Sequence, residues 1–328
     1  MKRREDHGST LTLRTAEYVR GLSAAEAIPR PAGLFGARAR SLETSSIFSN
    51  LDPLVEGPES SMGAGVLPGA TASAMDLIRS RVHTVLRDGS MATAFQPIYD
   101  LATGHVAGAE ALTRFDSGRD PDVWFAQAAT AGLAVDAELA AVEAALSAAV
   151  QLPDLLYVSV NASPVTCLSP RFSRLLRKAP VRADRIVLEL TEHSPVEDYT
   201  SLLNALAPLR SSGMRVAVDD AGAGHSSMLH ILRLAPDIIK LDKELITDID
   251  TNHLQKALGR AMVNFACDIG ATITAEGIET AAELATVTKL GMTSGQGYFL
   301  GHPTLLPDQW AQWHSHPGST MPMVAVSN

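Results

Sequence analysis

The chain has 328 residues, of which 46% are hydrophobic and 19% are charged, a balance typical of a globular protein with a sizeable core. Its formal net charge of −9 argues against a protein whose main task is to coat duplex nucleic acid. Cys167 and Cys267 are far apart and form no CxxC motif, which favours ordinary cytosolic thiols over a disulfide framework or a zinc–thiolate site.

Residues 1–73 lack the periodic apolar pattern of a folded domain, and prolines, glycines and serines interrupt them. We expect a flexible arm here, because so little apolar surface could be buried. No apolar region follows the charged N-terminus, and no run reaches the ~18 apolar residues that a membrane span needs. We therefore expect a cytoplasmic chain with neither a signal peptide nor a transmembrane segment.

A folded domain is predicted over residues 74–313, followed by a disordered tail over 314–328. Apolar residues at helical spacing from Leu77 to Leu86 predict a first helix, with Gly89 as its C-cap. Residues 93–99 and 106–112 are typical of two strands joined by a short turn. Because a parallel crossover needs a dozen or more residues, these two strands must be antiparallel.

A long alanine-rich helical stretch is predicted over 123–150. After it, short β-prone runs alternate with helical patterns at roughly 198–212, 225–235, 251–269 and 280–290. Buried parallel strands joined by crossover helices explain this alternation. We predict an α/β protein, a TIM-type (β/α)₈ barrel with an irregular first strand in preference to a doubly wound sheet. The apolar stripe from Leu254 to Ile269 is interpreted as core.

Most of the β-prone runs end in an acid, amide or amine side chain. In either α/β architecture the C-terminal ends of the strands meet at one face, where ligands bind. Each polar residue also has a structural explanation, such as an edge-strand glutamate or an asparagine N-cap. Together they indicate a site for hard cations, of the kind that supports two-metal hydrolysis of a phosphodiester. The residues are Glu110, Asn161, Glu189, Asp219, Asp220, Lys240, Glu276 and, more weakly, Gln296.

Eight motifs occur in order between about Leu77 and Pro303: Gln96-Pro97-Ile98, Glu110-Ala111-Leu112-Thr113-Arg114, Val160-Asn161-Ala162-Ser163-Pro164, Glu189-Leu190-Thr191-Glu192, Asp219-Asp220, Lys240-Leu241-Asp242, Ala275-Glu276-Gly277-Ile278-Glu279-Thr280 and Gln296-Gly297-Tyr298. In combination they resemble the EAL-domain family of cyclic di-GMP phosphodiesterases. The resemblance implies a TIM barrel with an antiparallel first strand, two Mg²⁺ or Mn²⁺ ions, and hydrolysis of cyclic di-GMP to 5′-pGpG in bacterial signalling. It also implies a homodimer.

The resemblance also implies a role for each residue that occupies a functional position in the family's motifs. The implied metal ligands, with Asp219 bridging the two ions and Asp220 on the second, are Glu110, Asn161, Glu189, Asp219 and Asp220. Residues implied around the attacking water are Lys240 and Gln296, with Glu276 as a general base or water-mediated metal contact. Residues implied to bind substrate are Gln96, Leu112, Arg114 and Asp242. Glu192 would anchor the loop that follows the two aspartates.

The loop after Asp219-Asp220 departs from the family pattern Asp-Asp-Phe-Gly-Thr-Gly-Tyr, because Ala221, Ala223 and His225 replace its Phe, Thr and Tyr. The smaller side chains predict a more mobile loop, and hence weaker metal binding or lower turnover. The alternative to an enzyme is therefore a catalytically weak or inactive cyclic di-GMP receptor or protein-interaction module. Retention of every implied metal ligand favours the enzyme. A different metal-dependent barrel enzyme is a more remote option.

Overall fold

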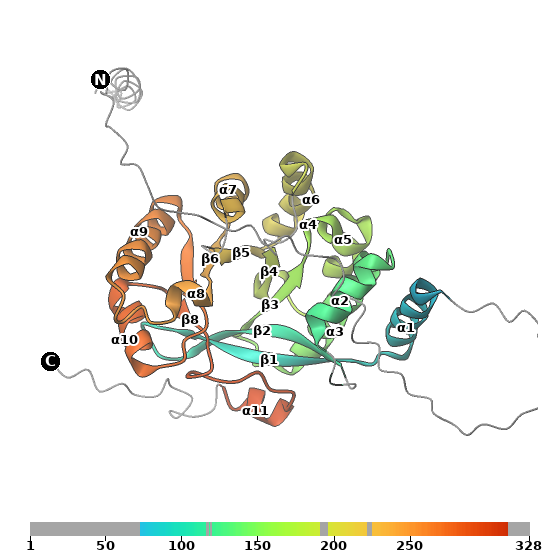
Figure 1. Ribbon diagram of the computed structural model, residues 1–328, viewed down its shortest axis with the longest axis horizontal. Helices are drawn as coiled ribbons and strands as arrows, with labels where there is room; N and C mark the ends of the chain where they lie inside the picture. The colour runs from blue at the N-terminus through green and yellow to red at the C-terminus, as the bar shows by residue number, and fades with distance from the viewer. Residues whose placement is uncertain (1–72, 116–117, 119, 191–195, 222–224, 314–328) are drawn as a thin grey trace, which may run out of the picture. The chain divides into compact units, whose positions relative to one another are not determined.

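The computed structural model describes residues 73–115, 118, 120–190, 196–221 and 225–313 (Figure 1). The expected arm, apart from Ser73, and the expected tail lie outside these residues. The first described helix, α1 (Ala74–Asp88), begins with a capping box in which Ser73 and Asp76 satisfy each other's backbone N–H groups. It ends at Gly89, which is in the left-handed conformation (φ 65°), so the predicted C-cap is confirmed.

Eight strands close into a barrel in sequence order. β1 runs antiparallel to β2 and β8, and the other neighbouring pairs are parallel. The predicted TIM-type barrel with an antiparallel first strand is therefore confirmed. The strands are β1 (Met91–Asp100), β2 (Val106–Phe115), β3 (Tyr157–Ala162), β4 (Ile186–Leu190), β5 (Arg215–Ala221), β6 (Ile238–Leu241), β7 (Thr272–Ala275) and β8 (Ser294–Gly295).

Helices surround this barrel, as Figure 1 shows. They are α2 (Pro121–Thr130), α3 (Ala134–Ala148), α4 (Pro164–Leu168), α5 (Pro170–Arg177), α6 (Tyr199–Ser211), α7 (His225–Leu234), α8 (Lys243–Ile246), α9 (His253–Ile269), α10 (Ala281–Leu290) and α11 (Pro307–Ala311). The single helix predicted over 123–150 was wrong. The helical stretch is interrupted at Gly132, whose φ of 75° separates α2 from α3 and lets α3 start in a new direction.

The core lies between the strands and the surrounding helices, and residues such as Phe95, Val158 and Leu188 are fully buried in it. α11 packs beside β1, where the Trp310 ring lies edge-on to the Phe95 ring at 4.8 Å between centroids. Within the described residues, no helix has the length and apolar character needed to cross a membrane.

The apolar stripe of α9 corrects another expectation. Met262 is buried, but the side chains of Leu254, Leu258 and Ile269 are 67%, 44% and 42% exposed. The interpretation of this stripe as core was therefore wrong for these three residues. The buried face of α9 is formed by Gly259, Met262 and Ala266 instead.

Candidate active site

The strand-end carboxylates converge on the ammonium group of Lys240, which is only 2% exposed. Lys240 Nζ lies 2.7 Å from Glu276 Oε1 and 2.8 Å from Glu189 Oε2. It lies 3.0 Å from Asp219 Oδ1 and 3.7 Å from Glu110 Oε2. These carboxylates come from β2, β4, β5 and the residue just after β7, so barrel closure gathers side chains that are far apart in sequence.

Amide side chains hold Glu110 from two sides. Asn161 Nδ2 donates to its Oε1 at 3.2 Å, and Gln296 Nε2 donates to its Oε2. Gln96 lies directly opposite Glu110 in the β1–β2 register, and its own Nε2 donates to the carbonyl of Gly301 at 3.0 Å. The structure thus brings together these four residues, which the sequence placed in separate motifs.

A second group of oxygens lies at the end of β5. One carboxylate oxygen from each of Asp219, Asp220 and Glu276 lies within 4.8 Å of the others. Asp220 has a φ of 52°, a left-handed conformation that costs an aspartate conformational energy. Such strain is typical of residues whose side chain must point in one direction for function.

The electrostatics of this group show an excess of negative charge. Burial raises the pKa of Glu189 to about 8, with Glu110 and Asp219 adding to the rise and Lys240 opposing it. Burial and the neighbouring Asp219 raise the pKa of Asp220 to about 6. For Lys240, burial alone would lower the pKa, but the surrounding carboxylates, Asp219 and Glu110 foremost, raise it well above its usual value. One ammonium therefore does not neutralise the carboxylates around it.

The donor set fits divalent cations. Carboxylate and amide oxygens are the ligands that Mg²⁺ and Mn²⁺ prefer. Asp219 Oδ1 is buried and, among the described residues, accepts no hydrogen bond, although it is within ion-pair distance of Lys240. A buried carboxylate oxygen that accepts no hydrogen bond is costly, and the one ammonium near it is shared with Glu189 and Glu276, so a metal ion would stabilise this oxygen further. The three-carboxylate group also has the spacing that ligands of one cation require.

The residues expected to bind substrate lie around the mouth of the barrel. Leu112 and Arg114 follow Glu110 at two and four residues along β2, on the same face and nearer its C-terminal end. Arg114 is half-buried, and its Nη1 donates to the carbonyl of Thr113. Asp242 caps the N-terminus of α8 and lies close enough to Asp220 to raise the pKa of that carboxyl.

Part of the altered loop lies outside the described residues. Glu192, the expected loop anchor, and residues 222–224 are not described by the structure. The backbone of His225 is described, but its side chain is not. Ala221 is described: it ends β5, lies opposite Leu241 of β6 and is fully buried. The small side chain that replaces the family's Phe is therefore packed against the core.

Sequence reasoning missed a layer of buried hydroxyl groups beneath the carboxylates. Ser159 Oγ donates to Glu189 Oε1, and Thr274 and Ser294 share a hydrogen bond of 2.8 Å. Each hydroxyl residue stands two positions before a site residue, namely Asn161, Glu276 or Gln296. Since side chains alternate along a strand, that spacing was the signal that these hydroxyls share the inner face of the barrel.

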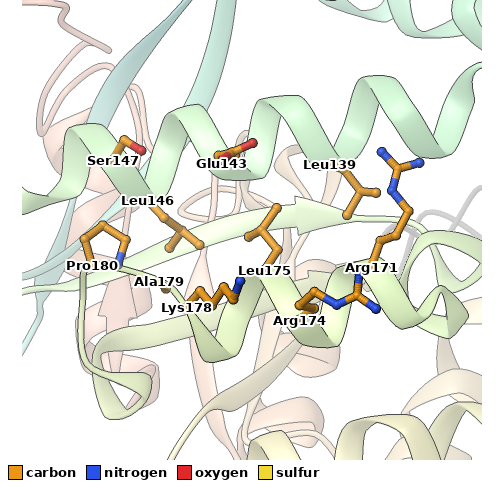
Figure 2. Close-up of a pocket in the computed structure, with 10 residues that line it drawn as sticks. All are labelled: Leu139, Glu143, Leu146, Ser147, Arg171, Arg174, Leu175, Lys178, Ala179 and Pro180. Atoms are coloured by element: carbon orange, nitrogen blue, oxygen red, sulfur yellow. The ribbon is translucent and has the colours of Figure 1, made fainter.

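A groove elsewhere on the surface is distinct from this site. Figure 2 shows that it runs between α3 and α5, with Arg171, Arg174 and Lys178 along one side and Glu143 on the other. Its volume is about 440 Å³, and none of the strand-end carboxylates lines it. Arg171 is paired with Asp136 at 2.5 Å. The groove does not contribute to the chemistry of the barrel mouth.

Among curated relatives, the probable cyclic di-GMP phosphodiesterase PdeA of Escherichia coli is 29% identical over 240 residues. That match covers 71% of this chain but 33% of PdeA. An uncharacterised protein of Sinorhizobium fredii, y4lL, is 28% identical over 83% of this chain and 34% of its own length. The chain thus spans about a third of the length of these relatives.

Solved structures show the same fold. A calcium and cyclic di-GMP complex of Klebsiella pneumoniae BlrP1 is 31% identical with a TM-score of 0.60, over 65% of this chain and 56% of that one. The FimX EAL domain of Xanthomonas citri with cyclic di-GMP has a TM-score of 0.64 over 71% of this chain and 95% of that one. At 18% identity, FimX supports the fold alone. The family model for the EAL domain matches residues 79–303, and the chain therefore belongs to the EAL domain family.

Proposed function

We propose that this chain hydrolyses cyclic di-GMP to 5′-pGpG with the help of two Mg²⁺ or Mn²⁺ ions. The observation that carries the proposal is the convergence of carboxylates from separate strands around a single ammonium that cannot neutralise all of them. Relatives named as cyclic di-GMP phosphodiesterases support the choice of substrate.

Glu110, Asn161, Glu189 and Asp219 would hold one ion, and Asp219 and Asp220 would hold the second. When bound, the two cations would lower the pKa of a water and offset the negative charge that develops on the phosphate. The chain's own contribution begins with Glu110, which two amides hold in one orientation. Ser159 holds Glu189 in the same way, because its hydroxyl donates a hydrogen bond to one carboxylate oxygen.

Lys240 and Glu276 would act on the attacking water. The Lys240 ammonium donates a hydrogen bond to Glu189 and forms ion pairs with Asp219 and Glu276 within 3.0 Å, which fix its position, and an N–H that is not used on Glu189 can orient the water. Burial raises the pKa of Glu276 well above its usual value, which makes this carboxylate a stronger base than an exposed glutamate. Gln296 would keep its amide beside both Glu110 and the reacting group.

The mouth of the barrel would bind the rest of the substrate. Arg114 offers a planar guanidinium suited to a phosphate or a guanine edge. Leu112, on the same face of β2, offers an apolar surface beside it. Gln96 and Asp242 would add polar groups to the opening.

The alternative is a receptor that binds cyclic di-GMP without turning it over, or a protein-interaction module. The observation that favours it is Ala221, because the family's larger Phe is missing at the end of β5, next to the two aspartates. The enzyme remains the first choice because Glu110, Asn161, Glu189, Asp219 and Asp220 are all present.

One experiment separates these functions. The purified full chain is incubated with cyclic di-GMP and Mg²⁺ or Mn²⁺, and the products are separated by chromatography. Accumulation of 5′-pGpG that Glu110→Gln abolishes and that Glu143→Gln, in the α3–α5 groove, leaves unchanged supports hydrolysis. Saturable binding of cyclic di-GMP without product would establish the receptor instead.

We also propose that the chain acts as a homodimer in the cytoplasm. Both cysteines are free thiols, which agrees with a reducing compartment. The acidic balance of the chain gives no support for binding to duplex nucleic acid.

A further inference from the structure

We propose that the α3–α5 groove is a docking surface for an acidic, amphipathic helix of a partner protein (Figure 2). The inference does not depend on hydrolysis, because none of the strand-end carboxylates lines the groove. One wall is the part of α3 from Leu139 to Ser147, and the other is the segment from Arg171 to Pro180, which includes most of α5. A groove of this kind is a common seat for a third helix.

The floor of the groove is aliphatic. Leu139 and Leu146 come from α3 and Leu175 from α5, and Figure 2 shows all three between the two helices. Among the described residues that line the groove, none is aromatic, so it offers no ring on which a nucleotide base could stack. Such a floor fits leucine-type side chains along one side of an incoming helix.

One edge of the groove is basic. Arg174 and Lys178 are exposed, and within the described part of the chain neither forms an ion pair. Arg171, on the same edge, is already paired with Asp136 at 2.5 Å. Glu143 is the one acid among the described residues that line the groove, so positive charge is in excess there. Because the chain as a whole carries a net charge of −9, this edge is a local site of attraction for carboxylates.

The spacing of the two cations favours a helical partner. Lys178 directly follows α5 and is four positions after Arg174, so one helical turn of about 6 Å separates them. Carboxylates at positions i and i+4 of a helix repeat at the same interval. A helix that lies along α5 can therefore pair with both cations while its apolar side faces the floor. The guanidinium of Arg174 can accept a carboxylate through two N–H groups at once.

The length of the walls sets the expected strength. From Leu139 to Ser147, α3 rises about 12 Å, which is little more than two helical turns. A contact of this length buries less area than the ~800 Å² per partner of a standard interface. We therefore expect reversible binding that weakens as the salt concentration rises, since the charged edge is exposed.

Fluorescence anisotropy with a defined peptide tests the proposal. The probe is a fluorescein-labelled synthetic helix of about four turns, with leucines along one side and glutamates at i and i+4 beside them. We expect saturable binding to the full chain and about tenfold weaker binding to Lys178→Glu. Lys289→Glu is the matched control and should bind like the wild type, because Lys289 is exposed at the end of α10 as Lys178 is at the end of α5. Absence of saturable binding, or equal affinities of the two variants, overturns the proposal.

Reversing the charge of the probe tests whether Lys178 pairs with it directly. A second peptide carries lysines in place of the glutamates. It should bind Lys178→Glu more tightly than Lys289→Glu, although the two variants have the same net charge. If the second peptide does not distinguish the variants, the basic edge does not recognise carboxylates, and the proposal fails.

A steric substitution tests the groove without changing its charges. Ser147→Trp places a large ring on the α3 wall and should weaken binding of the first peptide. Ala282→Trp, on α10, should not. Both positions are exposed, so neither ring has to enter the core. Undiminished binding to Ser147→Trp would show that the peptide lies elsewhere and would overturn the proposal.

Two further outcomes would assign the groove to another occupant and overturn the proposal. A labelled single-stranded oligonucleotide that binds as tightly as the first peptide, and that also loses affinity in Lys178→Glu, would identify phosphate groups as the ligand. A dimer of the full chain that Lys178→Glu dissociates in sedimentation velocity would identify a second copy.

Discussion

Lys240 is the residue on which the charge balance of the site depends. It contacts Glu189, Asp219 and Glu276 within 3.0 Å, and its side chain is almost completely buried. A buried charge that loses its partner costs several kcal/mol, and here several carboxylates share one ammonium. Lys240 and bound cations therefore stabilise the same set of negative charges.

From this balance we expect Lys240→Met to lower the free energy of unfolding of the metal-free protein by about 3 kcal/mol. Mn²⁺ should restore part of the loss, because it offsets the same carboxylates. Urea denaturation in EDTA and in Mn²⁺ measures both effects. Lys243→Met is the control: Lys243 pairs with Glu279 at the surface, where an ion pair adds little to stability, so this variant should lose far less stability than Lys240→Met. Equal losses in the two variants would contradict this account.

We expect Glu283 to make the free energy of unfolding depend on pH. Its carboxylate accepts hydrogen bonds from the backbone N–H groups of Glu279, Thr280 and Asp248 at 2.9–3.1 Å. Burial raises the pKa of Glu283, but these donors outweigh burial and hold the pKa below its usual value of 4.5. Because the folded pKa is the lower one, this stabilisation is present above the unfolded pKa and is lost as the pH falls through the folded pKa.

We therefore expect Glu283→Gln to reduce the free energy of unfolding at neutral pH by about 1–2 kcal/mol. The difference between variant and wild type should shrink as the pH is lowered below the unfolded pKa. Urea denaturation at a series of pH values provides the measurement. A gap that stays constant into the acid range would show that the charge of Glu283 is not what stabilises this junction.

Some residues of the site were predictable from the sequence and others were not. Glu110 and Glu189 stood out because a charged residue inside an apolar run is costly unless it has a partner. Ser159 did not stand out, because a hydroxyl residue fits any strand. The central position of Lys240 depends on which strand ends meet when the barrel closes, and no local pattern contains that information.

At the scale of elements, prediction worked where caps mark the ends of a helix. α9 and α10 end at Gly270 and Gly291, both left-handed, and the predicted ranges match them closely. α4 and α5 were not predicted. They are short, and each starts afresh at a serine cap followed by proline, so no apolar period runs long enough to be recognised.

Gly297 lets the loop after β8 pack closely against Ile278, and this packing supports Gln296. A Cβ at Gly297 would lie 2.2 Å from the backbone N and O of Ile278. Ile278 N–H also donates to the carbonyl of Gln296 at 3.1 Å, so the two loops cannot separate without breaking this bond. We expect Gly297→Ala to cost about 3 kcal/mol of stability and to lower 5′-pGpG formation by displacing Gln296.

Gly89→Ala is the matched control for Gly297→Ala. Gly89 is left-handed, but a Cβ there would meet nothing within 4 Å, so Gly89→Ala should cost only about 1 kcal/mol, which is what an L-residue loses in the left-handed conformation. Urea denaturation compares the two variants, and the chromatographic assay compares their activity. If Gly297→Ala proves no more damaging than Gly89→Ala, the close approach of the two loops does not constrain the site.

At the scale of the whole molecule, the site exists only because the barrel is closed. Residues from Gln96 to Gln296 meet at one mouth, and β1 completes the ring by pairing with both β2 and β8. The order of motifs along the chain was sufficient to predict this architecture, since alternating strands and helices have few stable arrangements. The interpretation of the apolar residues of α9 as core was wrong at Leu254, Leu258 and Ile269. Apolar residues at helical spacing form the same pattern whether or not their side of the helix packs against the barrel.

A cation held between β2, β3, β4 and β5 should stabilise the barrel as a whole. A ligand that binds only the folded state adds about 2.7 kcal/mol at a hundred times its dissociation constant, so Mn²⁺ should raise the melting temperature of the full chain. Asp219→Asn should remove most of this rise. In EDTA the same variant should melt no lower than the wild type, because repulsion between Asp219 and Asp220 is relieved. Glu143→Gln, outside the site, should keep the full rise. If Mn²⁺ does not change the melting temperature, or if it raises that of Asp219→Asn as much as that of the wild type, these carboxylates do not hold the ion.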